Sequence, residues 1–335
     1  MQIIQNRRNF LAGLTAAGAA GLMGAATPAV AEPPPETGRI RLSKNSGICL
    51  APQYVAEDLL YAEGFTHVDY VESQPGFGIA TDTASGKIDF SMNFIAPALV
   101  AVDQGHRLTL MGGIHPGCWE LFVQPGIGSI LQLKGRKVGV QAIGSAPHLF
   151  IVSIAAHVGL DPVRDIVWVS DPEVKPKELF LRGDVDAFLG FPPEPQELRA
   201  KAAGDVIINS ALDRPWSQYF CCVLAGNPGF IAANPVASKR VMRAILKAAD
   251  LCVADPAMVA RRLVEGKFTA NYDYALQALG EVPYKRWRDY DVEDTVRFYA
   301  LRLHEAGAIT ASPQEIIAKA TDWRFLNELR RELKS

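Results

Sequence analysis

The chain has 335 residues, about twice the length of a typical single domain, so two lobes or domains are expected. Its 49 % apolar residues support a large buried core and exclude a disordered chain. With 34 basic and 36 acidic residues, the net charge is −2, so the chain lacks the basic surface of a nucleic-acid-binding protein and we expect no nucleic-acid partner.

The first 31 residues are typical of an export signal. Arg7-Arg8 precedes Phe10-Leu11 and a mildly apolar run rich in Ala and Gly, and the segment ends in Ala29-Val30-Ala31, a small-x-small pattern that signal peptidase accepts. The arginine pair is typical of a twin-arginine signal. An N-terminal membrane anchor is the alternative, but the run is short and weakly apolar for a stable span. We expect cleavage of residues 1–31, a flexible tether over 32–38 and a periplasmic location.

Strand and helix patterns alternate after this segment. Strands are expected over 39–42, 67–71, 88–92, 108–111 and 120–123, and helices over 52–63, 77–84 and 95–104. Alternation of this kind predicts βαβ units and a mostly parallel sheet.

The same order of elements then restarts. Strands are expected over 137–141, 166–170, 185–189 and 206–209, and helices over 147–158, 177–181 and 194–203. Two short matches support an internal repeat: Gly86–Phe90 parallels Gly183–Ala187, and Glu63–Phe65 parallels Val158–Leu160 at nearly the same offset. The sequence therefore predicts two lobes of one architecture.

The last third of the chain is mostly helical. After an apolar strand over 219–224, helices are expected over 236–254, 257–266, 272–279, 292–306 and 314–320. We expect the chain to cross between the lobes near 122–126 and again near 216–221. Lobe one then comprises 39–123 and 221–335, lobe two comprises 124–220, and the two crossings form a hinge.

The cysteines and histidines show no ligand spacing. The five cysteines are an odd number without a Cys-x-x-Cys pair, and most lie in apolar runs, where free Cys behaves as a small hydrophobe. A disulfide cannot be assigned from this pattern, and the six histidines lack a His-x-x-x-His spacing. We predict no metal site and no cofactor.

Several motifs resemble those of the solute-binding proteins of ABC importers, in the group that handles nitrate, sulfonate, taurine and thiamine-pyrimidine compounds. They are Leu133–Val140 followed by Gly144-Ser145, and then 159–162, 181–187, 191–195 and Asn234-Pro235. The resemblance covers about residues 39–254. It implies an α/β fold of the two-lobed type II periplasmic binding protein class, with mostly parallel sheets flanked by helices, and a discontinuous lobe one with a helical C-terminal part.

The resemblance also implies a function. A monomeric periplasmic receptor would close on a small solute and present it to an inner-membrane ABC permease and its ATPase, without catalysis. One alternative is an enzyme like the thiamine-pyrimidine synthases of this fold, which use a His and iron and need a Cys-rich segment near the His; here Cys221-Cys222 is only a pair. Another alternative is a sensory receptor of the same fold. Elbow, zinc-helix and phosphate-loop motifs of other enzymes are absent from the sequence.

Candidate ligand contacts follow the expected strands. In open α/β sheets ligands bind beyond the carboxyl ends of the strands, where helix N-termini present unpaired N–H groups. The loops in these places provide Asn45, Ser46, Gly47, Gln74, Asn93 and Phe94 from lobe one, and Gly144, Ser145, His148, Glu173 and Phe191 from lobe two.

Each candidate has a structural alternative. The two serines can cap helices, the two glycines can serve turns, Asn93 can satisfy a turn, His148 can lie on an ordinary helix face, and the phenylalanines can be core. Helix termini favour an anion, but Lys44 is the sole base in these loops, and Glu173 with the aromatic residues suits a heterocycle or a zwitterion. The charge of the ligand stays open. We expect Asp89 and Asp186 to hold turns through backbone hydrogen bonds.

Overall fold

The structure is a computed structural model that describes residues 32–45, 47–74 and 76–333. The predicted export signal and Ser46 lie outside the described residues.

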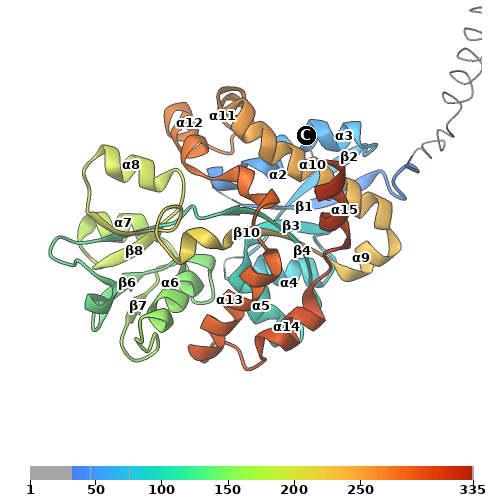
Figure 1. Ribbon diagram of the computed structural model, residues 1–335. Coiled ribbons are helices and arrows are strands. Elements are labelled where there is room, and N and C mark those ends of the chain that lie inside the picture. Colours follow the sequence, from blue (N-terminus) through green and yellow to red (C-terminus); the bar gives the residue numbers. More distant parts are fainter. Residues whose placement is uncertain (1–31, 46, 75, 334–335) are drawn as a thin grey trace, which may run out of the picture. The chain divides into compact units, whose positions relative to one another are not determined.

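Two five-stranded sheets carry the fold (Figure 1). The strands of the first sheet, in the order β2-β1-β3-β10-β4, are β1 (Arg39–Lys44), β2 (His67–Glu72), β3 (Phe90–Phe94), β4 (Thr109–Pro116) and β10 (Phe220–Gly226). Those of the second sheet, in the order β7-β6-β8-β5-β9, are β5 (Glu120–Val123), β6 (Lys137–Gly139), β7 (Val167–Val169), β8 (Ala187–Gly190) and β9 (Asp205–Asn209).

The two sheets share one topology. In the first sheet β10 runs antiparallel to both its neighbours, and in the second sheet β5 does the same, while the other four strand pairs that the structure describes are parallel. Each sheet is therefore mostly parallel with one reversed strand. This arrangement confirms the expected two-lobed α/β fold.

Strand β5 corrects one predicted boundary. The sequence pattern placed Glu120–Val123 in lobe one, but β5 pairs with β8 and β9 in the second sheet. The first crossing therefore lies between β4 and β5, ahead of the predicted 122–126. An apolar run predicts a strand, but it does not say which sheet the strand joins.

Helices flank both sheets. The helices of the described chain are α2 (Ala51–Val55), α3 (Glu57–Ala62), α4 (Gly78–Ala84), α5 (Ile95–Asp103), α6 (Ala146–His157), α7 (Pro176–Arg182), α8 (Glu194–Ala200), α9 (Pro228–Ala233), α10 (Pro235–Ala254), α11 (Pro256–Glu265), α12 (Tyr272–Glu281), α13 (Val292–Glu305), α14 (Pro313–Ala320) and α15 (Arg324–Glu332), with short 3-10 turns η1 (Ile48–Leu50), η2 (Ile130–Leu133), η3 (Trp216–Gln218) and η4 (Tyr284–Arg288). In Figure 1 the strands of the first sheet lie between α2 and α10 on one side and α4 and α5 on the other. The described helices include none that is both long and apolar enough to span a bilayer.

The internal repeat extends to single hydrogen bonds. The Asp89 carboxylate accepts the backbone N–H of Arg41 in β1 at 2.8 Å, and the Asp186 carboxylate accepts that of Lys137 in β6, also at 2.8 Å. The two aspartates therefore bond to the backbone, as expected. The partner in each case is the neighbouring parallel strand, and not a local turn.

The predicted tether is too long. The Glu36 carboxylate accepts the backbone N–H groups of Val236 and Ala237 at 2.9 and 2.8 Å, at the start of α10. Burial alone would raise the pKa of Glu36, but these hydrogen bonds lower it below its ordinary value. The side chain of Asn234, which precedes α10, makes no capping hydrogen bond, so a distant carboxylate caps this helix.

Candidate functional site

Loops that follow β1 and β8 contact each other directly. The Ile48 N–H donates a hydrogen bond to the Pro192 carbonyl at 3.1 Å. Gly47 has a φ of +137°, and a Cβ at this position would lie 3.4 Å from the ring of Phe191. Two predicted ligand residues from different lobes, Gly47 and Phe191, are therefore neighbours.

A second contact between the lobes is built on Gly144. Its φ is +81°, and a Cβ there would lie only 2.2 Å from the ring of Phe77, just ahead of α4. Both the backbone conformation and the close approach require glycine. Gly144 follows β6 and Phe77 follows β2, so this contact also joins the carboxyl ends of strands from the two sheets.

Ser145 occupies the N-cap position of α6 without capping it. Its side chain makes no capping hydrogen bond, although the residue is only 3 % exposed. Within the described chain its Oγ has no hydrogen-bond partner. The capping alternative is therefore wrong for Ser145, and a buried hydroxyl is left free beside the first N–H groups of a 12-residue helix.

His148 lies in the first turn of α6. Its Nδ1 accepts the Gly144 N–H at 3.2 Å, and its ring centroid is 4.5 Å from that of Trp168. Burial lowers the pKa of His148 to about 4, so the imidazole is neutral at physiological pH. Its described contacts are those of a residue that holds the loop before α6.

The aromatic candidates differ in burial. Phe94 is 2 % exposed and packs its ring edge-on against Phe150 and Tyr299, at centroid distances of 5.4 and 5.1 Å, so it belongs to the core. Phe191 is half-buried and lies 5.5 Å from Trp119. Phe191 is therefore the better placed of the two to contact a solute.

The remaining candidates make no hydrogen bond between the lobes within the described chain. The Asn93 Oδ1 accepts its neighbour's N–H at 2.8 Å, and Asn93 and Phe94 line a cavity of about 20 Å³, room for one water. The backbone N–H of Asn45 donates to the Tyr54 hydroxyl at 2.8 Å. Gln74 and Glu173 are exposed, and neither side chain makes a hydrogen bond to the other lobe within the described chain.

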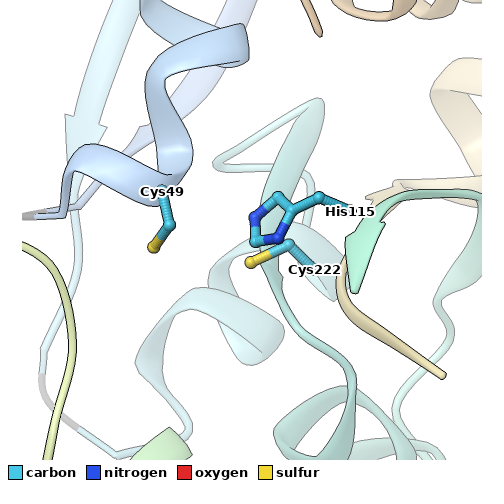
Figure 2. Close-up of side chains that lie close together, drawn as sticks. All are labelled: Cys49, His115 and Cys222. Carbon is cyan, nitrogen blue, oxygen red and sulfur yellow. The ribbon is translucent and has the colours of Figure 1, made fainter. Parts of the chain in front are cut away.

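A cluster of thiols lies where the loop after β1 meets β4 and β10, and the sequence pattern missed it. Four cysteines and one histidine gather there, all buried: Cys49, Cys118, Cys221, Cys222 and His115. Figure 2 shows the His115 ring and the Cys222 thiol pointing toward the segment that carries Cys49. The sulfur atoms of Cys49 and Cys222 and one ring nitrogen of His115 all lie within 4.8 Å of one another.

Contacts within the thiol cluster change the acidity of its members. The Cys118 and Cys221 sulfurs are 3.5 Å apart, and the Trp119 Nε1 donates to the Cys221 sulfur at 2.7 Å. Hydrogen bonds from Cys118 and Cys222 lower the pKa of Cys49 well below its ordinary value. Burial alone would raise the pKa of Cys221, but bonds from the same two thiols lower it to about 5. Cys252, which lies in α10, has a pKa raised by burial.

The spacing of these residues explains why the sequence did not reveal the cluster. Its members come from the loop after β1, the end of β4 and the start of β10, which are far apart in the chain. The signal that could have found them is the sheet order, because β10 pairs with β4 and places Cys222 opposite His115.

The two-lobed architecture, with strand-end loops that meet, is the fold of the periplasmic binding proteins. The periplasmic nitrate-binding protein NrtA from Synechocystis PCC 6803 superposes with a TM-score of 0.73 at 16 % identity, over 90 % of each chain. The alkanesulfonate-binding protein SsuA from Xanthomonas axonopodis pv. citri superposes with a TM-score of 0.68 at 18 % identity, over 88 % of this chain and 100 % of that chain.

The family follows from the sequence comparison. The NMT1/THI5 like family matches residues 50–258, more than half of the chain, and the chain belongs to this family. A curated relative, a 4-amino-5-hydroxymethyl-2-methylpyrimidine phosphate synthase from Aspergillus parasiticus, is 25 % identical over 232 residues, which are 65 % of this chain and 67 % of that protein. The resemblance to importer solute-binding proteins is confirmed, and fold and family fit a periplasmic solute-binding protein of the nitrate and sulfonate type.

Proposed function

We propose that the chain is the solute-binding component of an ABC importer, which captures a small solute between its lobes and delivers it to an inner-membrane permease. The observation that carries the proposal is the meeting of strand-end loops from both sheets, at Gly47 with Phe191 and at Gly144 with Phe77. In open α/β sheets this edge is where ligands bind. A solute that contacts both loops favours the closed arrangement by its differential contacts.

The chemistry of the α6 start favours an oxyanion. Ser145 Oγ is a buried hydroxyl donor without a described partner, next to helix N–H groups that carry partial positive charge. A sulfonate, taurine or nitrate would supply acceptor oxygens to these donors. The names of NrtA and SsuA, as nitrate- and alkanesulfonate-binding proteins, support this ligand class. A pyrimidine that stacks on Phe191 and Trp119 is the alternative ligand.

Calorimetric titration tests the proposal with nitrate, taurine, an alkanesulfonate and the hydroxymethylpyrimidine. We expect saturable binding of one of the anions, and a loss of about tenfold or more in affinity for Ser145→Ala, because the ligand then loses a buried hydrogen bond. Ser153→Ala is the matched control: Ser153 is buried in the same helix, but its hydroxyl donates to the Leu149 carbonyl at 2.8 Å. Silence toward every solute, or equal affinities in the two variants, would refute the proposal.

Catalysis is a second candidate function, favoured by a specific observation. The relative from Aspergillus parasiticus is named as a pyrimidine phosphate synthase, and His115 lies among four thiols. The test is rescue of growth in a strain that needs the pyrimidine, by the chain expressed without residues 1–31. Growth that depends on His115 would favour the enzyme, whereas solute binding without rescue would favour the receptor.

A further inference from the structure

The thiol cluster contains a histidine with one ring nitrogen that has no hydrogen-bond partner in the described chain. His115 is fully buried, and its Nδ1 lies 3.0 Å from the Pro116 carbonyl. Because a carbonyl only accepts, Nδ1 carries a proton, and Nε2 is the ring nitrogen that can bind a metal ion. Nε2 is buried and has no hydrogen-bond partner among the described residues. A backbone carbonyl that fixes the tautomer of an imidazole in this way is typical of metal-binding histidines.

The neighbouring groups supply three ligand atoms with His115 among them. Cys49 and Cys222 each have a sulfur within 4.8 Å of a His115 nitrogen and of each other. Ligand atoms around a tetrahedral zinc ion are about 3.5–3.8 Å apart, so a contraction by about one ångström closes the site. The fourth position of a tetrahedral ion would stay open to water or another small ligand.

We propose that Cys49, His115 and Cys222 form a binding site for a divalent cation of the zinc class. Sulfur and imidazole ligands select zinc over magnesium or calcium, which prefer oxygen. Two thiolates from Cys49 and Cys222 balance the charge of a divalent ion, which a buried site requires. On binding, the coordinating thiols release their protons to solvent and no electron is transferred.

A disulfide is the competing use of these thiols. The Cys118 and Cys221 sulfurs lie 3.5 Å apart, and oxidation would join them. That bond would leave Cys49, His115 and Cys222 in place, whereas a disulfide of Cys49 or Cys222 would remove a ligand. The proposal therefore concerns the reduced chain.

The proposed ion would anchor the loop that follows β1. Cys49 lies in η1, next to Ile48, whose N–H reaches Pro192 in the other lobe. The Tyr284 hydroxyl already donates to the carbonyls of Ile48 and Cys49, at 3.2 and 3.3 Å, and its ring lies edge-on to His115 at 5.2 Å. Coordination would add a bond from this loop to β4 and β10, so the ion should stabilise the fold.

The test is metal titration of the purified, reduced chain with zinc chloride, and with cobalt chloride as a spectroscopic probe. We expect one ion per chain, a rise in Tm with zinc, and the thiolate-to-cobalt charge-transfer absorption of a tetrahedral sulfur site. Cys49→Ala, Cys222→Ala and His115→Gln should each weaken binding by about 100-fold or more. Cys252→Ala is the control, because Cys252 is equally buried but lies outside the cluster, and it should bind as the parent chain does.

Three outcomes would overturn the proposal and do not depend on whether a variant folds. They are the absence of a cobalt charge-transfer band in the parent chain, a disulfide that includes Cys49 or Cys222 under reducing conditions, and preference for iron over zinc. Equal zinc affinity of Cys49→Ala and Cys252→Ala would do the same. Anomalous diffraction from crystals soaked in zinc chloride should place the ion between Cys49, His115 and Cys222. The test of the metal site is independent of the proposed solute binding, because neither the ion nor these variants involve Ser145.

Discussion

Their hydrogen-bond partners give two histidines of this chain different chemistry. The His148 ring is held neutral at the start of α6, with Nδ1 as an acceptor, whereas His115 donates from Nδ1 and presents a free Nε2. The sequence places His148 near a predicted strand end, and so identifies it as a candidate. The local sequence does not show that His148 is desolvated, because the Trp168 ring beside it comes from a different element, β7.

The pKa of His148 predicts acid sensitivity. The folded-state pKa of about 4 lies below the ordinary 6.5, so the unfolded chain binds the proton more tightly. The stabilisation is present above pH 6.5 and is lost as the pH falls toward 4. Between pH 7 and pH 5 the parent chain should lose on the order of 1 kcal/mol more stability than His148→Gln, after allowance for solvent screening. Urea unfolding at the two pH values measures this, and parallel losses would contradict it.

The sequence predicted candidate ligand contacts only where it also predicted the end of a strand. Gly47, Phe191 and Gly144 follow strands that the sequence pattern predicted, and the structure brings Gly47 and Phe191 together. The partner of Gly144, Phe77, and the cluster around His115 depend on which strands are neighbours. That information lies in tertiary packing, which local patterns do not contain.

Strands β3 and β8 are equivalent elements in the two lobes, and an aspartate precedes each. The sequence reveals this repeat because each strand follows a glycine and an aspartate at the same spacing, in Gly86–Phe90 and Gly183–Ala187. The sheet membership of β5 was not visible, because its apolar residues suit either sheet. Local periodicity therefore predicts elements, and hydrogen-bond partners decide their lobe.

The two aspartates should differ in their contribution to stability. Asp89 has a side chain 3 % exposed and also binds the Arg41 guanidinium at 2.5 Å, whereas the Asp186 side chain is 28 % exposed and lies 3.5 Å from Arg136. Asp89→Asn should therefore lower the free energy of unfolding by about 2 kcal/mol, and Asp186→Asn by about 1 kcal/mol. Chemical denaturation of both variants measures the difference. Equal losses would mean that burial does not distinguish the two positions.

At the scale of the whole molecule, contacts between the lobes come from both loops and charged side chains. The Arg199 guanidinium in α8 binds both carboxylate oxygens of Glu281 in α12, at 2.6 and 2.7 Å. Gln196 donates to the same carboxylate at 2.7 Å. The lobes are therefore also joined by side-chain hydrogen bonds between α8 and α12, apart from the loop contacts at Gly47 and Gly144.

Two glycines with the same backbone angle isolate the lobe contact at Gly144. Gly144 and Gly159 both have a φ of +81°, but a Cβ at Gly159 would meet nothing within 4 Å. Alanine should cost about 1 kcal/mol at either position because of the left-handed backbone. Only Gly144→Ala adds the clash with Phe77, so only this variant should give a larger radius of gyration in X-ray scattering. Phe77→Ala in that background should restore compactness; identical scattering of the two glycine variants would contradict the expectation.

The central position of β10 has a consequence for synthesis. This strand lies between β3 and β4, yet it follows them by more than a hundred residues. A nascent chain that has emerged only as far as β9 can complete the second sheet, but its first sheet still lacks the strand between β3 and β4. The N-terminal lobe, although it is made first, must therefore be the last to finish folding, and a ribosome-bound chain truncated before residue 220 should resist proteases only in its second lobe.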